Sequence, residues 1–140
     1  MASPPRSDIP GSFRFDFDEV NRILLLRLEG RMTEEMLREI YMVGKTHWTA
    51  TMPNAAIVDC SSVTQTTISS DRIRELARTK PMQETVGRPR VIVAPTTHQY
   101  GLARMFQLIT SEERPFTVVH TVDEALAELG VRFPHFEPLQ

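Results

Sequence analysis

The sequence predicts an α/β fold: a mixed, mostly parallel, five-stranded sheet with helices, in the order β-β-α-β-α-β-α-β-α. Three observations predict this class. Two strand-like segments near the start are joined by a short link, which is typical of an antiparallel hairpin. Three later apolar runs lack alternation, as parallel strands covered on both faces do. Helix signals follow the hairpin and each of these runs, and alternating strands and helices favour a parallel sheet.

The composition is that of a soluble globular domain. With 140 residues, 41% of them hydrophobic and 24% charged, the chain can bury a core without disulfides. The formal net charge of −2 gives no reason to expect nucleic acid or an anionic membrane as a partner. The longest aliphatic run, Ile23–Leu26, is far too short for a membrane span, so we expect no integral membrane association. The single cysteine, Cys60, excludes an intrachain disulfide and fits a cytoplasmic location.

We expect one domain at residues 13–131, between two terminal segments. Residues 1–12 are rich in Pro and Ser and contain no apolar run, so they predict a flexible lead and not a signal peptide. Residues 132–140 contain two Phe and two Pro. This tail should pack in an extended form or fray.

The first two strands follow from the alternation of side-chain type. Phe13, Phe15 and Phe17 alternate with charged residues, which predicts a half-buried strand. A second strand is expected at Ile23–Glu29, and Gly30 should end it.

The first helix is expected between Thr33 and about His47. Thr33 is a favourable N-cap, and Glu34 and Glu35 lie in the first turn, where the helix dipole favours negative charge. Apolar residues then recur at helical spacing, and Trp48 should close the hydrophobic face.

The middle of the chain predicts a buried strand, a polar loop and a second helix. Ala55–Cys60 is the strand, and the hydroxyl-rich Ser61–Thr67 is the loop. Ser69 or Ser70 should cap the helix. Its apolar face would contain Ile73, Leu76 and Ala77, and an exposed connection from Pro81 to Pro89 should follow.

The next unit begins with a buried strand at Arg90–Ala94. Thr96 and Gln99 have capping-box spacing, so a helix should begin near Thr97. The core face of that helix would be formed by Leu102, Met105, Phe106 and Ile109.

The last unit repeats this pattern. Phe116–His120 should form a buried strand, and Thr121 and Glu124 form another capping box. Gly130 is placed to end the final helix.

This element order, together with the segments IVDCSSV and VIVAPTTHQYGLARMF, resembles the STAS superfamily, in particular its SpoIIAA-like, STAS/CRAL-TRIO-related branch of small bacterial proteins. The resemblance extends from Phe13 to Val131. It implies a mixed sheet with helices mainly on one face, and often a homodimer. Members of this branch largely lack an assigned biochemical activity.

A second implication of the resemblance concerns phosphorylation. Anti-sigma-factor antagonists of this fold have an Asp-Ser-Ser-Gly motif at the start of a helix that follows a buried strand, and a partner kinase phosphorylates a serine there. The equivalent region here is Thr67–Asp71, so Ser69 or Ser70 would occupy the phosphoacceptor position. The leading Asp and the trailing Gly of the motif are missing.

Polar residues gather where the predicted parallel strands end. Ligands of open α/β sheets usually bind beyond the carboxyl ends of the strands, where helix N-termini favour anions. The candidate ligand-binding residues are Asp59, Ser61, Thr97, His98, Tyr100 and Arg104. Helix capping explains the Ser and Thr residues without a ligand and is the simpler interpretation.

Motifs of established catalytic or metal chemistry are absent from the sequence. Asp59, Ser61 and His98 or His120 do not make a convincing triad, because there is no G-x-S-x-G elbow. The four His lie on separate predicted elements without metal-ligand spacing, so we expect no metal and no cofactor. Cys60 should behave as a small buried hydrophobe.

Three hypotheses of function follow. The leading one is a non-enzymatic domain that binds a protein partner or a small polar or apolar ligand, with a homodimer also possible and no role for nucleic acid. The second is a partner-switching regulator that is phosphorylated at Ser69 or Ser70. The third is a small enzyme that uses Asp59 and His98.

Overall fold

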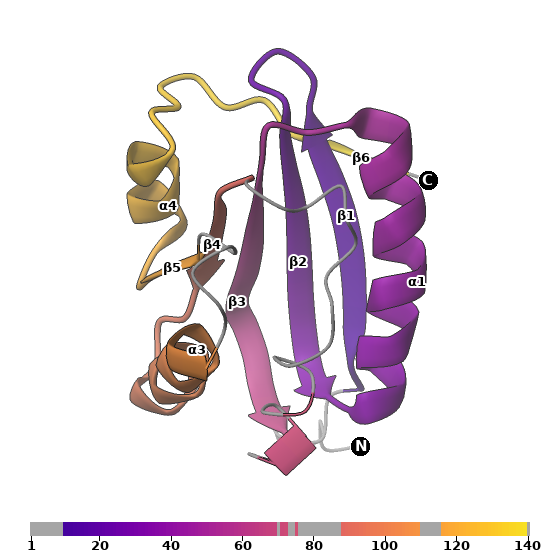
Figure 1. Ribbon diagram of the computed structural model, residues 1–140, viewed down its shortest axis with the longest axis vertical. Coiled ribbons are helices and arrows are strands. Elements are labelled where there is room, and N and C mark those ends of the chain that lie inside the picture. The colour runs from indigo at the N-terminus through magenta and orange to yellow at the C-terminus, as the bar shows by residue number, and fades with distance from the viewer. Residues whose placement is uncertain (1–9, 70, 73–74, 76–87, 110–115, 140) are drawn as a thin grey trace, which may run out of the picture.

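A computed structural model describes residues 10–69, 71–72, 75, 88–109 and 116–139 (Figure 1). Its elements are β1 (Ser12–Asp18), β2 (Ile23–Met32), α1 (Glu34–Thr51), β3 (Ala55–Thr66), β4 (Arg90–Val93), α3 (Thr97–Ile109), β5 (Phe116–Val119), α4 (Val122–Glu128) and β6 (Glu137–Pro138). Helical residues at Asp71, Arg72 and Glu75 belong to the second predicted helix. The rest of that helix, with its predicted apolar face, and residues 81–87 of the connection that follows lie outside the described residues.

The strands form one mixed sheet in the order β5-β4-β3-β2-β1-β6. Strands β2 to β5 are parallel, and β1 is antiparallel to β2, as expected for an opening hairpin. The predicted fold class is therefore confirmed. The sheet has six strands and not five, because the tail pairs Pro138 with Asp16 and Glu137 with Phe17.

One face of the sheet packs against α1. Phe15 is opposite Leu26 in the register of the hairpin, and both side chains are buried under the helix. The buried residues of α1 are spaced four apart, which gives one continuous stripe: Met36, Ile40, Gly44 and Trp48. Helix α3 packs on the same side, because its Ala103 joins Val118 of β5 and the partly buried Ile92 of β4.

The opposite face of the sheet packs against α4. Leu25, Ile57 and Val93 are completely buried there, beneath Ala125 and Leu126 of the helix. Figure 1 shows α1 beside β1, and α3 and α4 near the β4–β5 side of the sheet. Among the described helices, α1 and α3 thus cover one face and α4 covers the other. This agrees with the resemblance, which led us to expect helices mainly on one face.

The predicted helix caps are confirmed. Thr33 accepts a hydrogen bond from the Met36 amide, and Thr121 accepts one from the Glu124 amide. Thr96 accepts from the Gln99 amide, and the Gln99 side chain accepts from the Thr96 amide in return, as in a capping box. The side chains of the predicted core face of α3 (Leu102, Met105, Phe106 and Ile109) lie outside what the structure describes.

Helix α1 is one turn longer than predicted. It continues past His47 to Thr51 and ends at Met52, which adopts the left-handed conformation with φ 47°. The extra turn is stabilised by Trp48, which is buried within the helix stripe and does not merely follow it.

Strands β2 and β3 are also longer than predicted. The expected end of β2, Gly30, lies inside the strand with φ 76°, and the pairing with β3 shifts next to it. Most of the expected loop Ser61–Thr67 is strand, because β3 stays paired with β2 as far as Thr66. Among the described residues, no helix is long and apolar enough to cross a membrane.

Candidate functional site

The predicted site lies beside the end of β4 and not at the end of β3. Val93, the last residue of β4, pairs with Asp59 in the middle of β3. Beyond Asp59, β3 continues to Thr66 without β4 beside it. The start of α3 takes that place, because the Gln99 side chain donates a hydrogen bond to the Val63 carbonyl at 2.7 Å. This contact holds the exposed residues at the start of α3 against the projecting half of β3.

Asp59 and Ser61 bind each other. The Asp59 carboxylate accepts hydrogen bonds from the Ser61 amide at 2.9 Å and from the Ser61 hydroxyl. The pairing of β3 with β2 shifts at this point, which brings the serine back toward the aspartate. Asp59 is buried, with 8% of its surface exposed, and its second oxygen lies 3.7 Å from the Arg27 guanidinium.

Arg27 links Asp59 to a second buried carboxylate that the sequence analysis did not identify. Its Nε lies 2.9 Å from Asp16, whose side chain is 3% exposed, and Arg14 contacts Asp16 at 2.9 Å from the outer side. The chain of alternating charges Arg14–Asp16–Arg27–Asp59 therefore crosses three neighbouring strands. In the sequence, Asp16 is only one of the charged residues that alternate with the phenylalanines. That pattern indicates a strand face exposed to solvent and not a buried carboxylate.

The other predicted residues belong to α3. Tyr100 stacks on His120 with ring centroids 4.4 Å apart and planes 6° apart. Tyr100 also packs against the buried residues between α3 and β5. Thr97, His98 and Arg104 are exposed on the same helix. The structure thus brings together Asp59 with Ser61, and Tyr100 with His120.

The predicted phosphoacceptor region begins a helix, as expected. Ser69 is exposed, and its hydroxyl oxygen accepts a hydrogen bond from the Arg72 amide at 3.2 Å. Arg72 forms an ion pair with Glu75 at 2.9 Å. Ser70 lies outside the described residues.

Cys60 is half-buried, and its side chain packs against the core beneath α1. Burial, together with the negative charge of Asp59, raises the pKa of the thiol to about 12. The thiol is therefore protonated at neutral pH, as expected for a cysteine that acts as a small hydrophobe.

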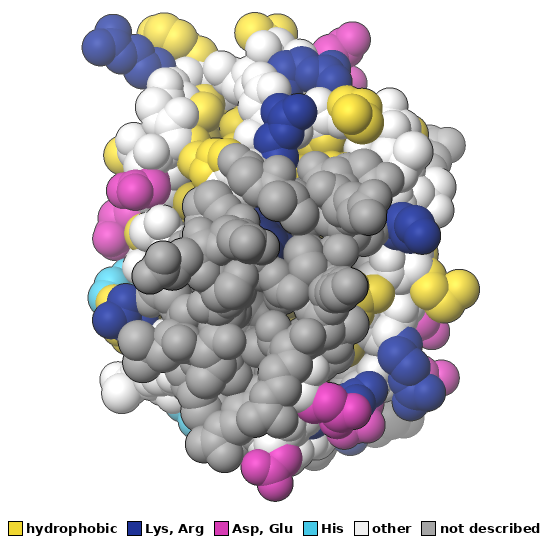
Figure 2. Space-filling model, viewed as in Figure 1, with side chains coloured by type: hydrophobic (Ala, Val, Ile, Leu, Met, Phe, Trp, Pro, Cys, Tyr) yellow, Lys and Arg dark blue, Asp and Glu magenta, His cyan; other side chains and the backbone are white. Residues whose placement is uncertain are grey.

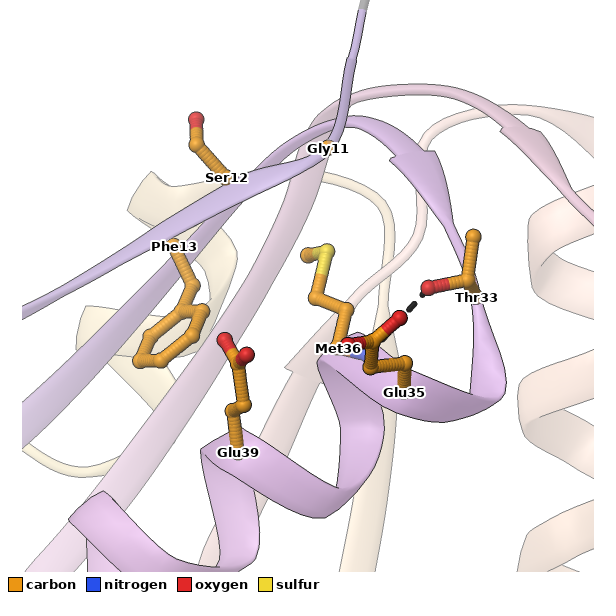
Figure 3. Close-up of a pocket in the computed structure, with 7 residues that line it drawn as sticks. All are labelled: Gly11, Ser12, Phe13, Thr33, Glu35, Met36 and Glu39. Atoms are coloured by element: carbon orange, nitrogen blue, oxygen red, sulfur yellow. Dashed lines mark hydrogen bonds between the residues drawn. The ribbon is translucent and has the colours of Figure 1, made fainter.

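Two pockets lie away from the predicted residues. One, of about 420 Å³, lies between the start of β1 and the first turns of α1 (Figure 3). The other, of about 130 Å³, lies between α1 and the sheet. The second pocket is well below the roughly 300 Å³ at which ligand pockets usually begin, so it has no room for a lipid chain.

Acidic and basic side chains are interspersed around the rim of the molecule in Figure 2. In the part of the chain that the structure describes, no three His, Cys, Asp or Glu side chains are grouped so that they would hold a metal ion.

Comparison with known proteins identifies the fold. No family model and no curated protein matches the sequence. An uncharacterized protein of the DUF3478 family with a SpoIIAA-like fold, from Shewanella loihica PV-4, is 13% identical, with a TM-score of 0.56 over 92% of this chain and 98% of that one. The unphosphorylated form of the anti-sigma factor antagonist SpoIIAA is 16% identical, with a TM-score of 0.57 over 85% and 98%.

A third solved structure gives the same result. An anti-sigma factor antagonist from Mycobacterium paratuberculosis is 19% identical, with a TM-score of 0.58 over 92% of this chain and 99% of that one. These likenesses show the SpoIIAA-like fold, as the resemblance in the sequence predicted.

Proposed function

We propose that this chain is a non-enzymatic domain that binds a protein partner through one polar surface. We call this surface the β3 corner. It is formed by the exposed residues Ser61, Ser62, Thr64, Gln65, Ser69, Thr97 and His98. One observation carries the proposal: β3 projects beyond β4, and the Gln99–Val63 hydrogen bond fixes the start of α3 against it. Exposed side chains of the projecting half of β3 and of the start of α3 are therefore held next to each other.

The chemistry of the corner favours binding over catalysis. A general base needs access to its substrate, but Asp59 is buried and engaged by Ser61 and Arg27. His98 is exposed, and the imidazole that stacks on Tyr100 is that of His120. The fold likeness to anti-sigma factor antagonists also supports a regulatory, partner-binding role.

Site-specific photo-crosslinking in the native host tests this proposal. A photoreactive amino acid replaces Thr64 or Thr97 in the β3 corner, or Glu128 on α4 as the matched control, since all three are exposed. We expect one crosslinked protein from both corner positions and none from position 128. Equal crosslinking at all three positions would show that the surface is not specific. A crosslink between two copies of the chain would show that the partner is a second copy, so that the chain forms a homodimer.

A second candidate function is regulation by phosphorylation at Ser69. This residue is exposed, and it lies at the start of a helix. A phosphate there would meet the positive end of the helix dipole, next to the amide of Arg72. Intact-mass analysis of protein from its own host should reveal an adduct of about 80 Da, one phosphoryl group. Ser69→Ala should remove the adduct and Ser70→Ala should not; the reverse pattern would assign it to Ser70.

A further inference from the structure

The larger pocket lies next to a strand edge. Figure 3 shows it between the start of β1 and the start of α1, with the side chains of Phe13 and Glu39 facing each other across it. Met36 stands between the strand and the helix, and Ser12 points away. The pocket opens to solvent and has a volume of about 420 Å³, within the range of ligand pockets.

The backbone beside this pocket has no neighbouring strand among the described residues. Strand β6 pairs only with Asp16 and Phe17, and its last contact is the hydrogen bond from the Leu139 amide to the Phe15 carbonyl at 2.8 Å. Backbone groups point to alternate sides along a strand, so the N–H and C=O of Phe13 point the same way as those of Phe15. The pair of backbone groups on Phe13 thus faces away from β2. An open strand edge of this kind can accept a further strand.

The side chains that line the pocket favour a ligand group that has an apolar stem and a positive charge at its end. The Phe13 ring and the Met36 thioether form the apolar part, and the exposed carboxylates of Glu35 and Glu39 form the rim. The first amides of α1 are positive, but Thr33 caps the Met36 amide. Two full negative charges outweigh the half charge of a helix terminus. A lysine or arginine side chain satisfies both requirements.

The position of Met36 in the pocket depends on Gly11. A Cβ atom at Gly11 would overlap the Arg31 carbonyl oxygen and come within 2.6 Å of the Met36 sulfur. Only glycine therefore allows the start of β1 to approach this closely, and the approach leaves the sulfur as the inner wall of the pocket.

We propose that the open edge of β1 and this pocket bind an extended peptide from a partner protein. The peptide adds as an antiparallel strand in line with β6, and its residue opposite Phe13 exchanges two backbone hydrogen bonds with it. Directly opposed side chains in a sheet lie on the same face. That peptide residue therefore places its side chain in the pocket, and it is a lysine or an arginine. This surface is separate from the β3 corner.

A designed probe peptide tests the proposal with the full chain. The probe is Lys-Thr-Val-Thr, acetylated and amidated at its ends, with a fluorophore. It begins at the lysine opposite Phe13, because Leu139 and β6 occupy the edge beside Phe15 to Phe17. Three matched peptides carry Met in place of the lysine, Glu in place of the lysine, or a methyl group on the lysine amide nitrogen. Binding is followed by fluorescence anisotropy and by backbone amide NMR. We expect shifts at residues 11–14 and 33–39. We also expect the N-methylated peptide to bind at least about tenfold more weakly, since it cannot donate to the Phe13 carbonyl.

Charge variants of the protein isolate the pocket. Glu35→Gln and Glu39→Gln should each lower the affinity for the lysine peptide by up to about fivefold, because an exposed ion pair contributes up to about that factor. The affinity for the methionine peptide should not change. Glu128→Gln on α4 is the matched control and should have no effect. The proposal fails if the N-methylated peptide binds equally well, or if the shifts map elsewhere.

Two other occupants of the edge would also overturn the proposal. If deletion of residues 1–9 tightens probe binding at least about tenfold, the chain's own lead, which contains Arg6, fills the pocket. Sedimentation could also show a dimer that the probe cannot dissociate. If the NMR shift of the Phe13 amide then changes in proportion to the fraction of dimer, a second copy of the chain covers the edge. Either result leaves the proposal for the β3 corner intact.

Discussion

At the scale of single residues, the buried carboxylates join segments that lie far apart in the sequence. Asp18, fully buried at the end of β1, accepts hydrogen bonds from the Asn21 amide at 2.9 Å and the Asn21 side chain at 2.7 Å. It also accepts one from the His135 amide at 3.0 Å. Burial raises the pKa of Asp18, but these hydrogen bonds outweigh it, so the pKa lies below its ordinary value. The ionised carboxylate therefore joins the hairpin turn to the tail.

This lowered pKa gives a signed prediction. A group whose pKa is lower in the folded state adds stability above its unfolded pKa of about 3.9, and that stability is lost as the pH falls through the folded pKa. Asp18→Ala should lower the free energy of unfolding at pH 7 by about 2–4 kcal/mol, because three part-buried N–H donors lose their acceptor. Urea denaturation at pH 7 and pH 3 should show that the variant and the wild type differ less in free energy of unfolding at pH 3. Glu19→Ala, in the same turn, is the control; an equal difference at both pH values would contradict the assignment.

The pKa of Cys60 predicts slow alkylation. With a pKa of about 12 in the folded protein, the thiolate is scarce at pH 8, whereas an unfolded cysteine titrates near 8.5. Iodoacetamide should therefore modify the native chain at least about 100-fold more slowly than the chain in urea. Thr49→Cys in a Cys60→Ser background places a thiol on the exposed side of α1 as the control. Equal rates for the two native thiols would disprove the protonated state.

At the scale of elements, the longer end of α1 is explained by Trp48, which is 4% exposed. Trp48→Ala should lower the free energy of unfolding by about 3–5 kcal/mol, because it leaves a large cavity against the sheet. Trp48→Phe should cost clearly less, since most of the ring volume is kept. Chemical denaturation followed by far-ultraviolet circular dichroism measures both. Similar losses for the two variants would mean that packing at this position is not decisive.

Features that depend on contacts between residues close in the sequence could be predicted. Features that depend on how the strands pair in the sheet could not. The caps at Thr33, Thr96 and Thr121 depend on contacts three residues apart, so their spacing is visible in the sequence. The second half of β3 is polar and becomes a strand only because β2 lies beside it. The same holds for the site. Arg27 lies opposite Asp59 through sheet register, and the pocket beside β1 requires α1 to pack next to it.

At the scale of the whole molecule, β6 covers part of an edge that would otherwise be open. Deletion of residues 137–140 removes its pairing with Asp16 and Phe17 and the Leu139–Phe15 hydrogen bond. We expect a loss of about 1–3 kcal/mol in the free energy of unfolding. We also expect concentration-dependent self-association, because exposed strand edges pair with one another. Sedimentation velocity over a range of concentrations measures the association. Pro138→Ala keeps the strand and is the control; a truncated chain that stays monomeric would show that the edge is protected in another way.

The contacts of the tail also bear on the order of folding. The hydrogen bonds Asn21–Phe133 and Asp18–His135 join residues 112 and 117 positions apart, whereas the hairpin and its turn close over a few residues. The entropy lost on closing a loop grows with its length, so we expect the local contacts to form first and the tail to dock late. Until it docks, β1 is an unguarded edge and Asp18 lacks the His135 amide. We therefore expect acid conditions, which protonate Asp18, to slow this last step and to lengthen the time during which newly folding chains can aggregate.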